Sequence, residues 1–327
     1  MKFLIEFYVI SLIGNKPLSD AIVISLRLLN RLTLLIVLTK PKCLLRSFIE
    51  NKRQRNGKTH LMLELYHSDI SPCAQKVRII LAEKGLTWTS HELDLQAGDQ
   101  FKPEYAKLNP KSVVPTLVHD GEPIIESTII AEYLDDVFPE IALRPKDPVE
   151  LARMRWWAKQ LDDGAHMSIG MISFGTTRRH QLKSKMTLKE LENHLNNIPN
   201  ENTRHWQRQV IEQGVKAPLL SGAVKLYFGH LQQMNDVLSN STWLAGETFS
   251  LADIAWAPYI TRLDWLGMGG MWTDNRPAVA NWYINVQARD SYRMAITDFV
   301  PPKEITILRK YGGLAWQKIK AMLDALE

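Results

Sequence analysis

Cysteine is scarce in this sequence, and several short chemical motifs are missing from it. Only 2 of the 327 residues are cysteine, which excludes a disulfide framework and is typical of a reducing compartment. The sequence contains no HExxH or CxxC spacing, no glycine-rich phosphate loop and no internal repeat. We therefore expect no metal site, and we expect the protein to be cytoplasmic.

A long uninterrupted apolar run is also missing. Residues 21–38 are about long enough to approach a membrane span, but Arg27, Asn30 and Arg31 interrupt them. No small-residue cleavage site follows an apolar core, so a secretory signal is not predicted. A transit-like presequence or an amphipathic segment on a membrane surface remains open for residues 1–60.

Charge is unevenly distributed along the chain. The formal net charge is +5, yet residues 1–60 hold 11 Lys or Arg against 3 Asp or Glu, so the remainder carries a net charge of −3. A mildly acidic body gives no reason to expect a nucleic-acid partner. The length and the apolar content of 45% are enough for two domains with proper cores.

Residues 61–78 join a predicted strand to a predicted helix. Ser71 followed by Pro72 is typical of a helix N-cap and first turn, and the helix is expected to run to about Lys84, before Gly85. Its unpaired amides and partial positive charge would stabilise an anion such as a thiolate beside the Ser71 hydroxyl. Taken alone, the same pattern also fits a plain helix cap.

The segments that follow alternate strands and helices, so that the whole stretch has the order βαβαββα. Asp120-Gly121 is a hairpin turn signal between the last two strands. The predicted elements after the first helix are a strand at 88–95, a short helix at 103–108, a strand opened by residues 109–117, a strand at 123–125 and a helix at 127–137.

This order and its motifs resemble the glutathione-binding, thioredoxin-like half of the glutathione transferase family over residues 62–139. The family implies a cis peptide bond between Val114 and Pro115, which would turn the Val114 backbone toward the cysteinyl part of glutathione. A trans edge-strand proline is the alternative. The motifs that carry the resemblance are Ser71-Pro72-Cys73 with Lys76-Val77-Arg78, Asn109-Pro110 with Val114-Pro115, and Glu126-Ser127.

The resemblance also implies a role for other residues along the bound tripeptide. Ser71 would donate a hydrogen bond to the glutathione thiolate and lower the pKa of that thiol. Ser127 would cap the next helix and bind the γ-glutamyl carboxylate, while Glu126 would accept from the ammonium group. Lys111 could meet the glycyl carboxylate, and a merely solvated lysine is the alternative.

Cys73 is a second nucleophile near the same helix start. In family members that run thiol transfer, cysteine occupies the position that matches Ser71, so disulfide exchange is not expected here. Cys73 is interpreted as structural if it faces the first turn of the helix. His166 and His180 are isolated in the sequence and are interpreted as core or surface histidines.

Residues 140–327 form the second half of the chain, and after a short linker their apolar residues recur at helical spacing. A long helix is predicted from an apolar face with spacings of three and four residues. The resemblance implies that the continuation of this helix faces the glutathione sulfur. We expect Met167, Met171 and Phe174 to line the second-substrate pocket, with a core position as the alternative. The inward positions identified on this helix carry no cation.

The rest of this half contains a polar insertion, a capping motif and a tail helix. Residues 176–215 are polar and are interpreted as a helical hairpin or a lid, with a solvated charged face as the alternative. Ser250 and Asp253 have capping-box spacing and match the buried cap of the family's helical domain, which is a structural role. A tail helix at 303–326 completes the domain.

Together these features predict a glutathione transferase of the serine type. Its architecture would be an α/β thioredoxin-like N-terminal domain at 61–139 and an all-α C-terminal domain at 140–327. We expect a homodimer that uses glutathione as co-substrate against a small hydrophobic aromatic electrophile. The insertion, Ile198-Pro199 and Trp206 resemble the bacterial glutathione-dependent β-etherases, which cleave lignin-derived aryl ethers.

Two other functions stay open at this point. A zeta-like maleylacetoacetate isomerase is weakened because the Ser-Ser-Cys run of that class is Ile-Ser-Pro-Cys here. A non-catalytic binding module is disfavoured because such modules typically lose the hydroxyl or thiol that Ser71 retains. Since Met62 stands where the first strand of such a domain begins, residues 1–60 are interpreted as a non-native extension from an upstream start.

Overall fold

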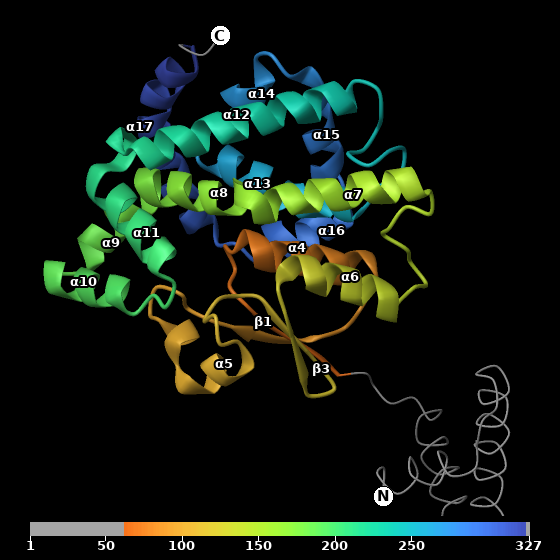
Figure 1. The fold of residues 1–327 in the computed structure, drawn as a ribbon, viewed down its shortest axis with the longest axis horizontal. Coiled ribbons are helices and arrows are strands. Elements are labelled where there is room, and N and C mark those ends of the chain that lie inside the picture. The colour runs from red at the N-terminus through yellow and green to blue at the C-terminus, as the bar shows by residue number, and fades with distance from the viewer. Residues whose placement is uncertain (1–61, 325–327) are drawn as a thin grey trace, which may run out of the picture. The chain divides into compact units, whose positions relative to one another are not determined.

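The computed structural model describes residues 62–324, and the element labels are those of Figure 1. The expectations for residues 1–60, whether non-native extension, presequence or surface segment, concern residues outside this range. Among the described helices, none is both long and apolar enough to cross a bilayer.

A four-stranded sheet has the strand order β2-β1-β3-β4. β1 (Leu63–His67) pairs parallel with β2 (Thr89–Glu92) and antiparallel with β3 (Thr116–His119). β3 pairs antiparallel with β4 (Glu122–Ile125), and both residues of the turn at 120–121 have positive φ. This is the hairpin that the Asp-Gly signal predicts.

Helices α4 (Pro72–Glu83) and α6 (Ser127–Val137) lie between the sheet and the helical half of the molecule, as Figure 1 shows. Leu65 of β1 stands opposite Leu117 of β3, and both are fully buried. They belong to a hydrophobic core that also holds apolar residues of both helices. Burying these side chains, at about 1.5–3 kcal/mol each, is what holds α4 and its N-terminus in a fixed position.

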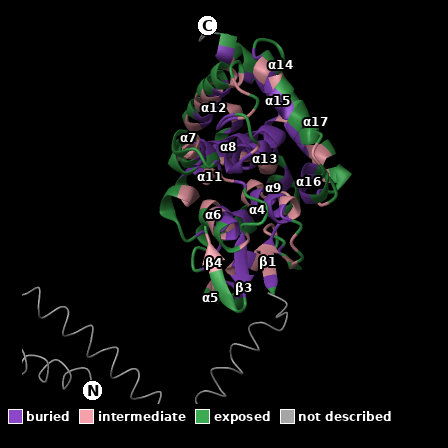
Figure 2. Cartoon of the chain, turned by 90° about the vertical axis from the view of Figure 1, so that its right-hand side faces the viewer, coloured by how far each residue is buried: buried purple, intermediate pink, exposed green. Residues whose placement is uncertain are grey.

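The short α5 (Pro103–Leu108) is the other helix of the sheet half, and the elements after α6 are helical. Nearly all of α13 is buried, and it runs through the interior of the helical half in Figure 2. The main helices there are α7 (Pro148–Gln160), α8 (His166–Ser173), α9 (Arg179–Lys185), α10 (Leu188–Asn196), α11 (Glu201–Gln213), α12 (Pro218–Leu238), α13 (Leu251–Trp265), α15 (Pro277–Gln287) and α17 (Pro302–Asp324).

Helices α7, α8 and α9 follow one another through two π-helical turns, η2 (Leu161–Ala165) and η3 (Phe174–Arg178). Gly164 in η2 has a φ of 156° and is not helical. The helix is therefore kinked at Gly164, so the side chains after the kink do not continue the 3.6-residue apolar face of α7. The residue that begins α8 directly after this turn is His166.

The polar insertion folds around a small core of its own. Five apolar side chains from α9, α10, α11 and the turn after α10 pack together there: Leu182, Leu191, Leu195, Ile198 and Ile211. The insertion is therefore a set of helices with a hydrophobic centre rather than a solvated charged stretch.

The two halves share one hydrophobic core, and arginine contacts also join them. Arg78 of α4 donates from Nε to the Ala295 carbonyl, 2.8 Å away. Glu83 at the end of α4 pairs with Arg289 at 2.7 Å and accepts from the Ser291 hydroxyl. Because all these contacts lead to α4, that helix is fixed from both sides.

The predicted architecture, a thioredoxin-like sheet half and an all-helical half, is confirmed. The helices expected at 103–108 and 127–137 have those bounds, whereas the strand expected at 88–95 is shorter, at Thr89–Glu92. One detail was wrong: Ser127 does not cap α6, because it is the first residue of that helix and Glu126 occupies the cap position without a side-chain hydrogen bond.

Candidate functional site

Ser71 lies in the loop between β1 and α4, as the N-cap of that helix. Its Oγ accepts a hydrogen bond from the Ala74 amide at 3.4 Å, and its side chain is half-buried. Because Pro72 has no N–H and the Gln75 amide donates to the Ser71 carbonyl at 2.9 Å, the groups left to stabilise an anion here are the Ser71 hydroxyl proton and the Cys73 amide.

The loop that carries Ser71 is held by side chains from both halves. Arg78 donates to the carbonyls of Ser68 and Asp69 at 3.1 and 2.7 Å. Arg262, from α13 in the helical half, donates to the Ile70 carbonyl. These guanidinium contacts fix the backbone immediately before Ser71.

Cys73, two residues after Ser71, faces two side chains of the helical half. Its Sγ lies 3.5 Å from His166 Nδ1 and 3.4 Å from the Tyr259 hydroxyl. His166 Nδ1 and the Tyr259 hydroxyl are themselves 3.1 Å apart. We name Cys73, His166 and Tyr259 the thiol cluster.

The thiol cluster favours a thiolate next to an imidazolium. Burial by itself raises the pKa of the Cys73 thiol, but the charge and hydrogen bond of His166, the Lys76 ammonium and the Tyr259 hydroxyl lower it to about 6. In turn, the Cys73 thiolate raises the pKa of His166. Near neutral pH the pair therefore holds its proton on the histidine.

The peptide bond between Val114 and Pro115 is cis, as the resemblance implies. The Asn109 side chain holds the backbone that precedes this bond. Its Nδ2 donates to the Val113 carbonyl at 2.9 Å, and its Oδ1 accepts from the Lys111 amide at 3.1 Å. Val114 and Pro115 are both buried. The segment before β3 thus has one defined backbone path.

Two of the residues predicted to bind glutathione contact each other. Lys111 Nζ lies 2.5 Å from Glu126 Oε1, and both side chains are exposed. Glu126 has a φ of 70°, a conformation that non-glycine residues adopt rarely and that concentrates at functional sites. Ser127 follows it and is buried.

The three side chains predicted to line the second-substrate pocket lie in different environments. Met167 is 45% exposed, whereas Met171 is buried in the main core. Phe174 is half-buried and packs edge to face on Trp206 of the insertion, with ring centroids 5.6 Å apart. The insertion therefore contributes an aromatic side chain next to this stretch of helix.

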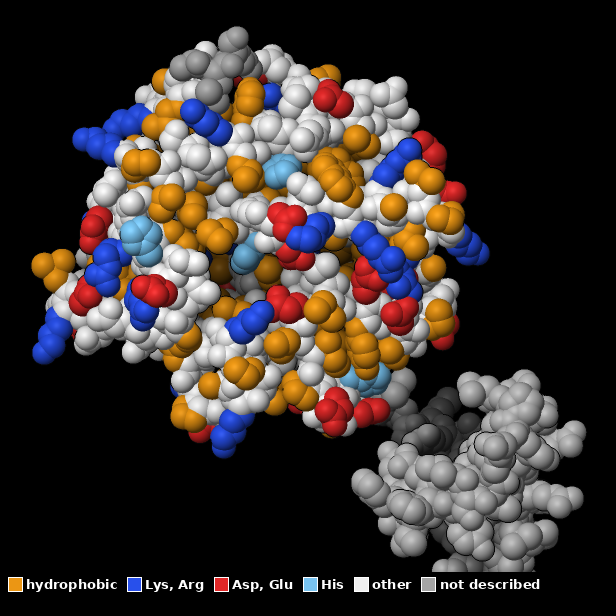
Figure 3. Space-filling view, viewed as in Figure 1, with side chains coloured by type: hydrophobic (Ala, Val, Ile, Leu, Met, Phe, Trp, Pro, Cys, Tyr) orange, Lys and Arg blue, Asp and Glu red, His pale blue; other side chains and the backbone are white. Residues whose placement is uncertain are grey.

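Figure 3 shows a hollow on the face that carries α8 and the start of α4, with hydrophobic atoms at its floor and a histidine beside it. Two cations that the sequence reasoning missed lie near this region. Arg178, in η3, contacts Gln181 at 2.7 Å and Glu304 of α17 at 3.5 Å. Arg262 contacts the Ser173 hydroxyl at 3.2 Å in addition to the Ile70 carbonyl.

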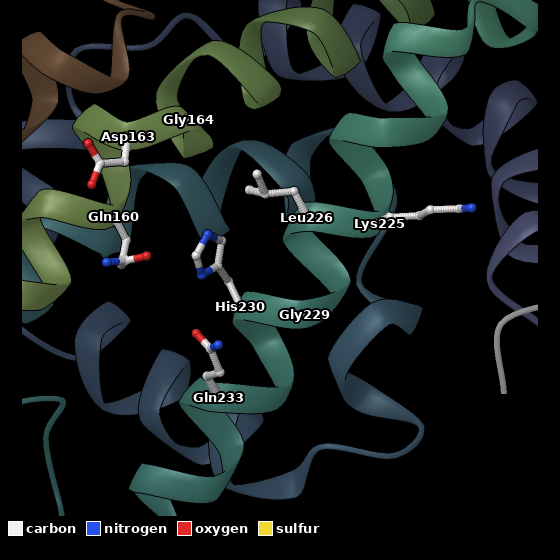
Figure 4. Close-up of a pocket in the computed structure, with 8 residues that line it drawn as sticks. All are labelled: Gln160, Asp163, Gly164, Lys225, Leu226, Gly229, His230 and Gln233. Atoms are coloured by element: carbon white, nitrogen blue, oxygen red, sulfur yellow. The ribbon is translucent and has the colours of Figure 1, made fainter.

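A separate hollow of about 230 Å³ lies between the end of α7, the turn η2 and helix α12. Figure 4 shows the side chains of Gln160, Asp163 and His230 around it. None of its lining residues comes from the loop before α4 or from that helix's first turn. It is therefore distinct from the site around Ser71.

Ser250 and Asp253 form the capping box of α13. Asp253 is fully buried, and one of its oxygens accepts from the Leu244 amide and the Trp282 indole, both at 2.9 Å. The other oxygen accepts from the amide and the hydroxyl of Ser250. Within residues 62–324, no group of three or more His, Cys, Asp or Glu side chains is arranged to hold a metal ion.

The thiol cluster is the part of the site that the sequence reasoning missed. Cys73 was interpreted as structural and His166 as an isolated histidine, but the fold brings them together from positions 93 residues apart. The available signal was that His166 lies on the helix expected to face the glutathione sulfur.

Two domain families match this chain. The family described as glutathione S-transferase, N-terminal domain, matches residues 70–137, and the one described as glutathione S-transferase, C-terminal domain, matches residues 208–285. Protein LigF of Sphingobium sp. (strain NBRC 103272 / SYK-6) is 31% identical over 71% of this chain and 92% of its own length. A solved structure of the beta-etherase LigF from strain SYK-6 aligns with a TM-score of 0.64 and 29% identity, covering 71% of this chain and 98% of that one.

Two further relatives bear on the chemistry. The tetrachloro-p-hydroquinone reductive dehalogenase of Sphingobium chlorophenolicum is 27% identical over 71% of this chain and 95% of its own length. Glutathione S-transferase Z1 of Arabidopsis thaliana is 45% identical, but only over 26% of this chain and 38% of its own length.

Proposed function

Because the chain belongs to the glutathione S-transferase family, we propose that it transfers glutathione to a hydrophobic aromatic electrophile and that the specific reaction is the cleavage of a β-aryl ether. In that reaction the glutathione sulfur attacks the carbon that carries the aryloxy group. A carbon–sulfur bond forms, and the carbon–oxygen bond breaks.

The observation that carries this proposal is the position of Ser71. Its hydroxyl lies at the N-terminus of a 12-residue helix whose start is fixed by Arg78 and Arg262. A hydroxyl donor and a helix N-terminus both favour the ionised form of a bound thiol. Lowering the pKa of that thiol by about two units corresponds to about 2.7 kcal/mol, at about 1.36 kcal/mol per unit.

The remaining tripeptide would lie along the residues that precede β3 and begin α6. In the proposal, the Val114 backbone pairs with the cysteinyl part, Glu126 accepts from the ammonium group, and Ser127 donates to the γ-glutamyl carboxylate. Pro115 and Lys111 are the other two proposed contacts of glutathione, and Lys111 lies near the glycyl carboxylate. The supporting observations are the cis peptide bond between Val114 and Pro115, the positive φ of Glu126 and the position of Ser127 directly after it, as the first residue of α6.

An aromatic second substrate is supported by two separate observations. The relatives that match most of this chain include a beta-etherase and a reductive dehalogenase of a chlorinated hydroquinone. The insertion brings Trp206 against Phe174 beside Met167 and Met171 of α8. Apolar walls of this kind bind aromatic rings and exclude water from the thiolate.

The zeta-like isomerase is the second candidate, since the similarity to glutathione S-transferase Z1 is high but local. An isomerase of a dicarboxylate needs free cations for the two carboxylates. Our expectation of no cation concerned only the inward positions identified on the first long helix, and Arg178 and Arg262 lie outside those positions but in the same region. Both already contact protein groups, namely Glu304, Ser173 and Ile70, which leaves the aryl ether as the favoured substrate.

A cytoplasmic homodimer is part of the same proposal. Ile129 on α6 and Trp156 on α7 are 59% and 46% exposed, and a pair between Glu132 and Arg155 links the two helices at 2.8 Å. Large apolar side chains exposed on neighbouring helices are typical of a subunit contact. The scarcity of cysteine agrees with a reducing compartment.

The test measures products directly. The purified protein is retained on a glutathione matrix and then given glutathione with a β-aryl ether, a halo-aromatic compound or maleylacetoacetate. We expect a glutathione conjugate by mass spectrometry from the aromatic substrates, a released phenol from the ether, and little isomerisation. Efficient isomerisation without any aryl conjugate would overturn the proposal in favour of the zeta-like function. Retention on the matrix with no turnover of any substrate would favour a binding module.

A further inference from the structure

His166 is positioned to act on a substrate rather than to fill the core. It begins α8 directly after the π-helical turn η2, and its side chain is exposed. Its Nδ1 is turned toward Cys73 and Tyr259, at 3.5 and 3.1 Å. Since Cys73 belongs to the first turn of the helix that Ser71 caps, His166 lies within about one helical turn of the proposed thiolate site.

The groups around His166 favour its protonated form. Cys73 and Lys76 face it from α4, Asp162 from η2, and Tyr259 from α13. The charge and hydrogen bond of the Cys73 thiolate and the Asp162 carboxylate raise the pKa of His166, whereas desolvation of the ring and the Lys76 ammonium lower it, and the net direction is upward. Lys76 Nζ and Asp162 Oδ1 contact the same Thr128 hydroxyl, at 3.5 and 3.4 Å. The Asp162 carboxylate therefore offsets part of the Lys76 positive charge.

The proposed ether cleavage needs a proton donor that the thiolate machinery does not supply. An aryloxide is a poor leaving group because phenols have a pKa of about 10. Ser71 is assigned to the glutathione thiolate, and a neutral serine is a weak acid. A positioned donor at the departing oxygen typically accelerates such a step by roughly a hundredfold to ten-thousandfold.

Resting on the proposed ether cleavage, we propose that His166 is the general acid that protonates the departing aryloxide, with Cys73 as the anionic partner that keeps its imidazole charged. The glutathione sulfur forms the new bond to carbon, and the electron pair of the broken carbon–oxygen bond leaves with the aryloxide. That oxygen takes the proton from His166 Nε2, the ring nitrogen opposite Nδ1. Water then returns a proton to the exposed imidazole, so that glutathione and the ether yield a thioether and a phenol.

The neighbouring groups suit this task less well. Tyr259 is fully buried, and burial raises its pKa well above the ordinary value. Lys76 is 3% exposed and contacts Thr128. Cys73 holds a negative charge rather than a proton in the charged pair. Of these side chains, His166 combines exposure to solvent with a proton held near neutral pH.

The experiment varies the leaving group on one electrophilic skeleton. The skeleton carries chloride, which needs no proton, 4-nitrophenoxide, which is a weak base, or 2-methoxyphenoxide, which is a stronger base. Wild type is compared with His166→Gln and with His91→Gln, a control histidine that pairs with Glu64 on the sheet at 2.7 Å. We expect His166→Gln to lower kcat/KM roughly a hundredfold for 2-methoxyphenoxide, with little change for chloride and an intermediate loss for 4-nitrophenoxide.

Each other outcome has a defined meaning. An equal loss on all three substrates, or no loss with 2-methoxyphenoxide, would overturn the role of His166 and leave the ether cleavage intact. A wild-type enzyme that replaces chloride but cleaves neither ether would contradict the proposed function, and the acid role would fall with it. The pKa of the bound glutathione thiol, measured from thiolate absorbance, should be the same in wild type and His166→Gln.

Discussion

Lys111 Nζ lies 2.5 Å from Glu126 Oε1, so two side chains assigned to opposite ends of glutathione are paired with each other. Exposed ion pairs contribute at most about 1 kcal/mol. We therefore expect Lys111→Ala to change KM for glutathione by less than about fivefold. Glu126→Gln removes a charged acceptor of the ligand's ammonium, at about 1.5–3 kcal/mol, and should raise KM about tenfold or more. Steady-state kinetics at saturating electrophile would check both, and kcat should stay nearly constant.

A contrary result for this pair is easy to recognise. If Lys111→Ala raised KM more than Glu126→Gln, the lysine would be the main anchor of the tripeptide. If both variants lowered kcat with KM unchanged, neither residue would bind the ground state of glutathione.

Replacing Ser71 tests the thiolate donor and the helix cap separately. Ser71→Ala and Ser71→Gly both remove the hydroxyl, so both should lower kcat roughly tenfold to a thousandfold. They differ as caps: alanine costs about 1 kcal/mol of stability, whereas glycine costs only a few tenths. We expect equal kinetic losses and a lower melting temperature for the alanine variant alone. Kinetic losses that follow the melting temperatures would assign Ser71 to folding only.

The reactivity of Cys73 should follow its charged partner. Because His166, Lys76 and Tyr259 lower the pKa of the Cys73 thiol to about 6, the thiolate fraction rises through that pH. Alkylation by iodoacetamide, read from the Cys73 peptide by mass spectrometry, should be half-maximal near pH 6. In His166→Gln the midpoint should move upward, toward the ordinary thiol value of about 8.5. A midpoint near 8.5 in wild type would contradict the charged pair, and the Cys43 peptide is quantified separately.

Much of the fold could be predicted because the sequence signals for helix starts and turns are local. Pro103 and Ser127 mark the starts of helices whose observed bounds match the predicted ones. The turn at 120–121 gave the β3–β4 hairpin in the same way. β2 was overestimated because it pairs only with β1, and that pairing ends at Glu92 although apolar residues continue beyond it.

The thiol cluster could not be predicted in the same way. Tyr259 lies 186 residues from Cys73 in the sequence, and no local pattern reports which residues two helices bring together. The π-helical turn at Leu161–Ala165 adds a further obstacle. A 3.6-residue period cannot be carried across it, so the apolar pattern of α7 does not indicate which residues of α8 face α4, and His166 was overlooked.

The last prediction concerns Asp253, whose two oxygens accept four hydrogen bonds. In Asp253→Asn, one of these oxygens becomes an NH2 group that faces two donors, whichever way the amide is turned. Because the site is fully buried, donors left without an acceptor each cost about 1–3 kcal/mol. We expect a loss of about 3 kcal/mol or more in the free energy of unfolding, measured by urea denaturation.

Ser250→Ala is the matched control, because it removes one hydroxyl from the same capping box and should cost only about 1 kcal/mol. Asp253 belongs to the interior of the helical half and not to the site around Ser71. The fraction of Asp253→Asn that stays folded at low temperature should therefore keep the wild-type kcat. A large loss of kcat in folded protein would show that the buried carboxylate also supports catalysis. A stability equal to that of Ser250→Ala would show that it contributes less to the start of α13 than its four hydrogen bonds indicate.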